Sequence, residues 1–97
     1  MRFEWDENKR LSNLAKHGLD FSKVGPLFEN DGRLLTAEGL RGIYGESRFI
    51  GFGRLRNEVV AICFTTRSEV IRIISLRKAN SREKKKYEQK IKAQNLW

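Results

Sequence analysis

The sequence is poor in the residues that build disulfides and metal sites. Its 97 residues include one cysteine, one histidine and only three aspartates. The single cysteine, Cys63, excludes an internal disulfide, and its place in the apolar run VVAICF predicts a buried thiol in a reducing compartment. No D-x-D, H-E-x-x-H or histidine pair is present, so a two-metal nuclease centre would lack ligands. We therefore expect no metal site.

Long apolar runs are also missing. The longest, Val59 to Phe64, has six residues, whereas a helix needs about 20 to cross a bilayer. The first ten residues, MRFEWDENKR, lack the apolar region of a signal peptide. We expect a cytoplasmic protein with no membrane contact. A hydrophobic content of 39% with one proline fits a single globular domain over residues 1–97.

Positive charge is what the sequence has in excess, with a net charge of +8. Residues 72–92 hold nine Lys and Arg against two Glu, so most of the excess lies in one strand and helix segment. Such a surface suits a polyanion, and nucleic acid is the first expectation. The alternative is a solvated basic tail that serves solubility.

The first helix is predicted over residues 7–17. Asp6 is suited to cap its start, and Gly18 is suited to end it in a left-handed Schellman conformation. Leu11 and Leu14 form the apolar stripe expected to face the core. The opposite, polar side carries Lys9, Asn13, Lys16 and His17. A histidine there either satisfies the helix dipole or transfers protons, and the sequence leaves both readings open.

The later elements indicate an α+β fold. Residues 21–28 have apolar positions at helical spacing, which predicts a second helix capped by Asp20, and Asn80 is suited to cap a third helix over residues 81–92. The initial RFEW could form an edge strand, and four further strands are predicted: RLLTAEG, SRFIGFGR, EVVAICFTT and EVIRIISLR. We expect two N-terminal helices and a C-terminal helix on one side of a twisted, mainly antiparallel sheet of about four strands.

The last predicted strand carries two arginines. Simple alternation places Ile71, Ile73, Ser75 and Arg77 on one face and Val70, Arg72, Ile74 and Leu76 on the other, and apolar residues on both faces predict a central strand. Arg77 is suited to hold a phosphate, whereas Arg72 either does the same or pairs within the fold. Arg48 and Arg67 lie in neighbouring strands or turns. A guanidinium holds phosphate oxygens bidentately and stays charged.

The sequence also lacks a glycine-rich phosphate loop, because GFGRLR has no third glycine and no helix after it. If the protein cuts nucleic acid without a metal, the available route is attack of a ribose 2′-hydroxyl on the adjacent phosphorus. Side chains would move the protons and arginines would stabilise the phosphorane. This route restricts the substrate to RNA.

Three stretches are distinctive: FEWDENKRLSNLAKHGLDF (3–21), RGIYGESRFIGFGR (41–54) and RIISLRKANSREKKKYE (72–88). On them the chain resembles the BrnT toxins of bacterial type II toxin–antitoxin systems, relatives of the RelE-like ribonucleases. The resemblance implies a RelE-like fold and an endoribonuclease without metal or organic cofactor, which cleaves mRNA, on or off the ribosome, and arrests translation and growth. It also implies a BrnA-like antitoxin that neutralises the toxin and through which alone the toxin contacts DNA.

The resemblance further implies a set of site residues. The expected catalytic residues are His17, Lys16, Glu46, Arg48, Arg67 and Arg77, and the expected RNA contacts are Arg72, Arg82, Lys84, Lys85, Lys86 and Tyr87. A packing role for Tyr87 stays open, because Ile91 follows at helical spacing. Trp5 and Asp6 are expected to serve packing and capping rather than catalysis.

Two other functions remain open for the same residues. One is a nucleic-acid-binding domain that breaks no bond, in which the cations supply affinity only. The other is a basic helix that docks an acidic protein partner and contacts no RNA.

Overall fold

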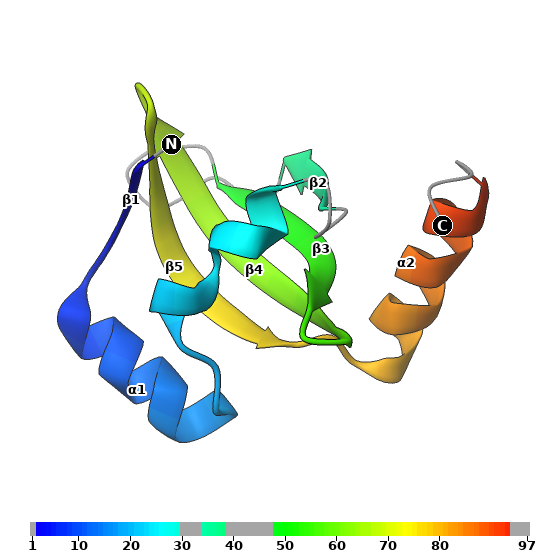
Figure 1. Cartoon of the computed structure of the whole chain (residues 1–97), viewed down its shortest axis with the longest axis horizontal. Coiled ribbons are helices and arrows are strands. Elements are labelled where there is room, and N and C mark those ends of the chain that lie inside the picture. Colours follow the sequence, from blue (N-terminus) through cyan, green and yellow to red (C-terminus); the bar gives the residue numbers. More distant parts are fainter. Residues whose placement is uncertain (1, 30–33, 39–47, 94–97) are drawn as a thin grey trace.

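The computed structural model describes residues 2–29, 34–38 and 48–93. It confirms an α+β fold, with most elements at the predicted places (Figure 1). The helices are α1 (Glu7–His17), two 3-10 helices, η1 (Phe21–Lys23) and η2 (Gly25–Phe28), and α2 (Ser81–Ala93). The strands are β1 (Arg2–Trp5), β2 (Leu35–Glu38), β3 (Phe49–Leu55), β4 (Glu58–Arg67) and β5 (Val70–Lys78).

The five strands form one mixed sheet in the order β1-β5-β4-β3-β2. The pairings among β2, β3, β4 and β5 are antiparallel, as expected. The stretch RFEW does form an edge strand, but it pairs with β5 in parallel, so the sheet is not purely antiparallel. Strand β5 lies between β1 and β4, which agrees with the internal position predicted for it.

The predicted second α-helix was wrong. Two short 3-10 helices occupy this stretch, and they still bury Phe21, Val24 and Leu27. Pro26 explains the difference, because proline has no N–H to donate and its ring clashes with the preceding turn of an α-helix. Helical spacing therefore identified the buried side of this segment, although not its conformation.

The helices lie on both faces of the sheet, which contradicts the expectation of one covered side. Val60 belongs to the core cluster that contains Phe21 and Leu27 of the 3-10 helices, whereas its neighbour Val59 packs with Tyr87 and Ile91 of α2. Successive strand residues point to opposite faces. Helix α2 is therefore on the opposite face from η1 and η2, and Figure 1 shows it at the far end of the sheet from α1.

Helix α1 has the predicted ends. The Asp6 carboxylate accepts from the Lys9 N–H at 3.1 Å, and Gly18 is left-handed at φ 70°. Its N–H donates to the Leu14 carbonyl at 2.8 Å, which is the single-bond left-handed ending rather than the Schellman pair. The capping argument thus located both ends of the helix.

The orientation predicted for α1 was wrong. Leu11 and Leu14 are 51% and 37% exposed, whereas Asn13, on the supposed polar side, is 9% exposed. Strand β1 ends before Leu76, and the Asn13 side chain takes over the hydrogen bonding of this part of the β5 edge. It accepts from the Leu76 N–H at 3.2 Å and donates to the Leu76 carbonyl at 2.8 Å and to the Leu19 carbonyl at 3.0 Å. A buried backbone group without a hydrogen-bond partner costs about 1–3 kcal/mol. The hydrogen bonds of Asn13 therefore decide which side of α1 faces the sheet, and the exposure of Leu11 and Leu14 follows.

Candidate functional site

The face of β3, β4 and β5 that points away from the 3-10 helices is called the open face here. Directly opposed residues of paired strands lie on the same face. Cys63 of β4 is opposite Ile50 of β3 and Ser75 of β5, and Thr65 is opposite Arg72. The described side chains of this face include Ile50, Cys63, Thr65, Arg67, Arg72, Ser75 and Arg77. Helix α2 packs on the end of this face at Val59. Ile50, Arg67, Arg72 and Ser75 of this face are exposed among the described residues.

A β-bulge determines which arginines reach this face. The pairing of β4 with β5 shifts between Cys63 and Phe64, which leaves Ile74 as an extra residue of β5. Arg72 and Arg77 consequently lie on the same face, although simple alternation assigned them to opposite faces. That prediction was wrong because alternation assumes unbroken pairing.

Arg48 lies beside the thiol of Cys63, immediately before β3. Both side chains are half-buried. Burial raises the pKa of Cys63 because it disfavours the thiolate, and the positive charge of Arg48 opposes this rise. A third arginine therefore adds positive charge at the β3 side of the open face.

Arg72 and Arg67 are both exposed. Arg72 pairs with Glu4 of β1 at 3.6 Å, and their side chains are 46% and 51% exposed. Arg67 is exposed at the end of β4, opposite Val70. An exposed ion pair contributes about 0–1 kcal/mol to stability. A phosphate could therefore displace Glu4 from Arg72 with little loss of free energy.

Arg77 is fixed by the start of α2. Its guanidinium donates to both carboxylate oxygens of Glu83, at 2.7 and 2.9 Å. Glu83 also accepts from the Asn80 N–H at 2.9 Å, and the Asn80 side chain accepts from the Glu83 N–H at 2.8 Å. The hydrogen bonds from Arg77 lower the pKa of Glu83 to about 2, and the same contact raises the pKa of Arg77. The N-cap was predicted, but the role of Glu83 was missed, although the Asn80-x-x-Glu83 spacing is that of a capping box.

Helix α2 presents most of its cations to solvent. Tyr87 is 3% exposed and packs with Val59 and Ile91, so the structure gives its ring the packing role that the sequence left open. The residues expected to contact RNA that are exposed on this helix are Arg82, Lys84, Lys85 and Lys86.

Helix α1 carries His17 and Lys16, and this helix lies against β5 rather than β3. His17 is half-buried and Lys16 exposed, both in the last turn of α1. Helix α1 lies against β5, so β4 separates it from β3 and the neighbouring Arg48. Glu46 lies outside the described residues.

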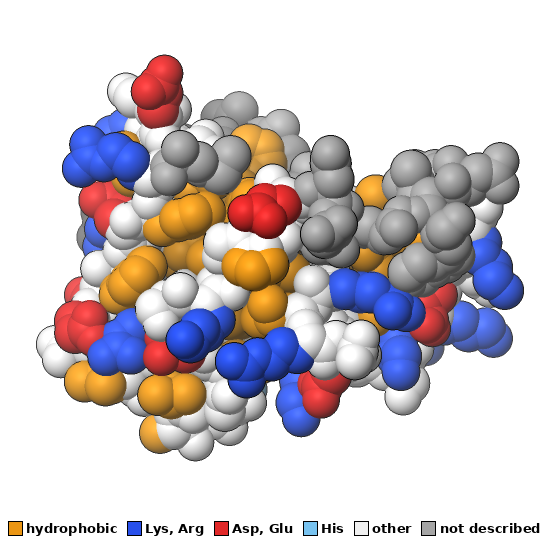
Figure 2. All heavy atoms as spheres, viewed as in Figure 1, with side chains coloured by type: hydrophobic (Ala, Val, Ile, Leu, Met, Phe, Trp, Pro, Cys, Tyr) orange, Lys and Arg blue, Asp and Glu red, His pale blue; other side chains and the backbone are white. Residues whose placement is uncertain are grey.

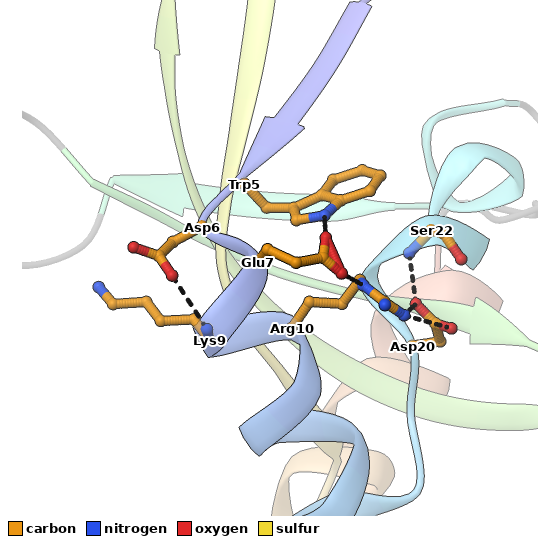
Figure 3. A network of polar contacts seen from close by, with 7 residues as sticks. All are labelled: Trp5, Asp6, Glu7, Lys9, Arg10, Asp20 and Ser22. Atoms are coloured by element: carbon orange, nitrogen blue, oxygen red, sulfur yellow. Dashed lines mark hydrogen bonds and ion pairs between the residues drawn. The ribbon is translucent and has the colours of Figure 1, made fainter.

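A polar network fixes the N-terminal segment (Figure 3). Arg10 donates to Glu7 and to both carboxylate oxygens of Asp20, the latter at 3.3 and 3.2 Å. The Trp5 indole donates to Glu7 at 3.3 Å, and the Ser22 N–H donates to Asp20 at 2.9 Å. The Ser22 hydrogen bonds, followed by Arg10, lower the pKa of Asp20. The first distinctive stretch of the sequence thus joins β1, α1 and η1.

Two kinds of feature are missing from the part of the chain that the structure describes. No three His, Cys, Asp or Glu side chains lie close enough together to hold a metal ion. None of the described helices has the length and apolar content to span a membrane.

These observations define a class of small, basic α+β proteins with an arginine-bearing sheet face that is open at one end and bounded by a cationic helix at the other. A family model described as "Ribonuclease toxin, BrnT, of type II toxin-antitoxin system" matches residues 5–83. The chain belongs to this BrnT toxin family. No curated protein matches it.

Proposed function

We propose that the chain is a metal-independent endoribonuclease that cleaves RNA by attack of a ribose 2′-hydroxyl. The observation that carries this proposal is the placement of Arg72 and Arg77, together with Arg48 beside Cys63, on one face of the sheet. Their guanidinium groups supply the charge that binds a scissile phosphate and stabilises the pentacoordinate transition state. The scarcity of aspartate and histidine in the sequence supports a route without metal.

The remaining site residues divide into two roles. His17 is assigned to proton transfer, because it is the one histidine of the chain and histidine is the side chain that most often acts as a general acid or base. Glu46 is the second candidate for that step, and Lys16 and Arg67 add positive charge near the phosphate. The RNA backbone beyond the scissile bond is followed by the exposed cations of the first half of α2, which are Arg82, Lys84, Lys85 and Lys86.

In the cell, cleavage of mRNA by this chain would stop translation and growth. A cognate BrnA-like antitoxin would bind the chain and neutralise it, and contact with DNA would run only through that antitoxin. Membership of the BrnT family supports this proposal, since a type II system pairs a toxin with a protein antitoxin.

The test is cleavage of a defined RNA by the purified chain in EDTA, compared with Arg72→Ala. The matched control is Lys90→Ala, which removes one exposed cation of α2. We expect the wild type and the control to leave 2′,3′-cyclic phosphate ends, and Arg72→Ala to cut at least about tenfold more slowly. Activity that requires a divalent metal, or products with 5′-phosphate and 3′-hydroxyl ends, would contradict the proposed route.

Non-catalytic RNA binding is the second candidate, and the Arg77–Glu83 pair favours it, because a guanidinium held by a carboxylate is less available to a phosphate. In that case RNA binds the wild type and remains intact. Arg72→Ala would then weaken binding modestly and lower the salt dependence by about one counterion.

A further inference from the structure

A shallow groove of about 350 Å³ lies between the end of α1 and the turn that joins β3 to β4. Its apolar lining comes from Leu14, Leu19 and Leu55, and its rim includes Lys23, Arg56 and Lys78. Leu11, one turn earlier on α1, extends the exposed apolar surface beyond the groove. Figure 2 shows hydrophobic side chains at the surface over α1, with Lys and Arg side chains close by.

The apolar part of this surface is a consequence of how α1 is attached. Asn13 turns its side of the helix toward the β5 edge, which leaves Leu11 and Leu14 on the solvent side at 51% and 37% exposure. Adjacent exposed leucines on a helix beside a groove are typical of a surface that a partner covers.

The charges of the rim are unbalanced. Its two carboxylates already have partners, since Asp20 pairs with Arg10 at 3.2 Å and Glu58 pairs with Lys78 at 3.5 Å. Lys23 and Arg56 have no ion-pair partner among the residues that the structure describes. The groove therefore offers an apolar floor with two available cations.

Arg56 occupies an unusual backbone conformation at this rim. It forms the two-residue turn between β3 and β4 with Asn57, at φ 53° and 67°. Such turns favour Asn-Gly or Gly-Gly, because a residue with a side chain is strained in the left-handed region. An arginine held there against its backbone preference is a feature associated with binding sites.

We propose that this groove docks an acidic segment of a protein partner, which places one large apolar side chain against Leu14 and Leu55 and its carboxylates on Lys23 and Arg56. The proposal depends on the proposed function at one point, because it takes the antitoxin as the protein that carries this segment. The groove lies between the β3–β4 turn and the end of α1, and none of the open-face arginines lines it, so docking would leave those arginines in place.

The first experiment is selection of peptides of about 12 residues from a random displayed library on the full chain, after depletion on the double variant Lys23→Glu/Arg56→Glu. We expect the recovered peptides to combine Asp or Glu with Leu, Ile or Phe. A synthesised peptide should bind the wild type at least about tenfold more tightly than the double variant or Leu14→Ser. The matched control, Lys90→Glu/Lys92→Glu, makes the same charge change on α2 and should alter the affinity less than about threefold.

The second experiment is co-purification of the cognate antitoxin with each variant, together with RNA cleavage by each. The antitoxin should accompany the wild type and the α2 control but not Lys23→Glu/Arg56→Glu, which should still cut RNA. The docking assignment would be overturned if the selection gave no peptide or only peptides without acidic residues. It would also be overturned if RNA displaced the peptide, or if the double variant captured the antitoxin as well as the wild type does. A wild type that captures the antitoxin at this groove but cuts no RNA would overturn the proposed catalytic function alone.

Discussion

Replacement of Glu83 by Gln should destabilise the protein in a manner that depends on pH. Glutamine preserves the shape of the capping box, so the change isolates the charge interaction with Arg77. The pKa of Glu83 falls from an ordinary 4.5 to about 2 in the fold. A shift of this size corresponds to about 3 kcal/mol of stability at neutral pH. Arg77 is 43% exposed, and solvent screening reduces the expected effect to about 1–1.5 kcal/mol.

The sign follows from the lowered pKa. The ionised carboxylate stabilises the fold fully above the unfolded value of 4.5, and this contribution is lost as the pH falls towards 2. Urea denaturation of wild type and Glu83→Gln should therefore differ at pH 7 and converge near pH 2.5. At pH 7 the melting temperature should fall by roughly 5–10 °C.

The matched control is Glu88→Gln on the same helix. Glu88 pairs with Arg54 at 3.9 Å, with side chains 40% and 35% exposed, so we expect a loss of about 0.5 kcal/mol or less. Equal losses for Glu83→Gln at pH 7 and pH 2.5, or no loss at pH 7, would refute the assignment of this ion pair as a joint between β5 and α2.

Four other changes have defined outcomes. Asn13→Ala should lower the free energy of unfolding by about 2–4 kcal/mol in urea, because Leu76 loses both backbone partners. Arg56→Gly should raise it by about 0.5 kcal/mol through relief of the left-handed turn, measured the same way. His17→Gln should preserve the melting temperature and slow RNA cleavage by about 10²; equal rates would return His17 to a helix-ending role. Alanine at lysines 84–86 should lower the slope of log affinity against log salt by about 2 in filter binding to single-stranded RNA.

Local rules predicted the capped elements of this fold well. Asp6 and Gly18 defined α1, and Asn80 defined the start of α2, because each cap depends on a few neighbouring residues. The strands were also recognisable, since β-branched and aromatic runs are bounded by turns. What these rules could not supply was the arrangement of the elements relative to one another.

Long-range hydrogen bonding accounts for most of the rest. The orientation of α1 depends on Leu76, 63 positions from Asn13, and the pairing shift in β5 appears only when β4 lies beside it. Both features affect the candidate site directly. Alternation along β5 alone assigns Arg72 and Arg77 to opposite faces of the sheet. Only the β-bulge in the pairing of β4 with β5 shows that they share a face.

The parallel pairing of β1 with β5 has a consequence for how the protein is made. Residues 2–5 pair with residues 70–73, so β1 is synthesised long before its partner and cannot pair until β5 has left the ribosome. Such distant contacts slow folding, and an unpaired strand edge can associate wrongly in the meantime. The arginine face is assembled from β3, β4 and β5, so it does not exist on a nascent chain that lacks β5. A ribonuclease of this architecture would therefore become active only after its β5 has been translated.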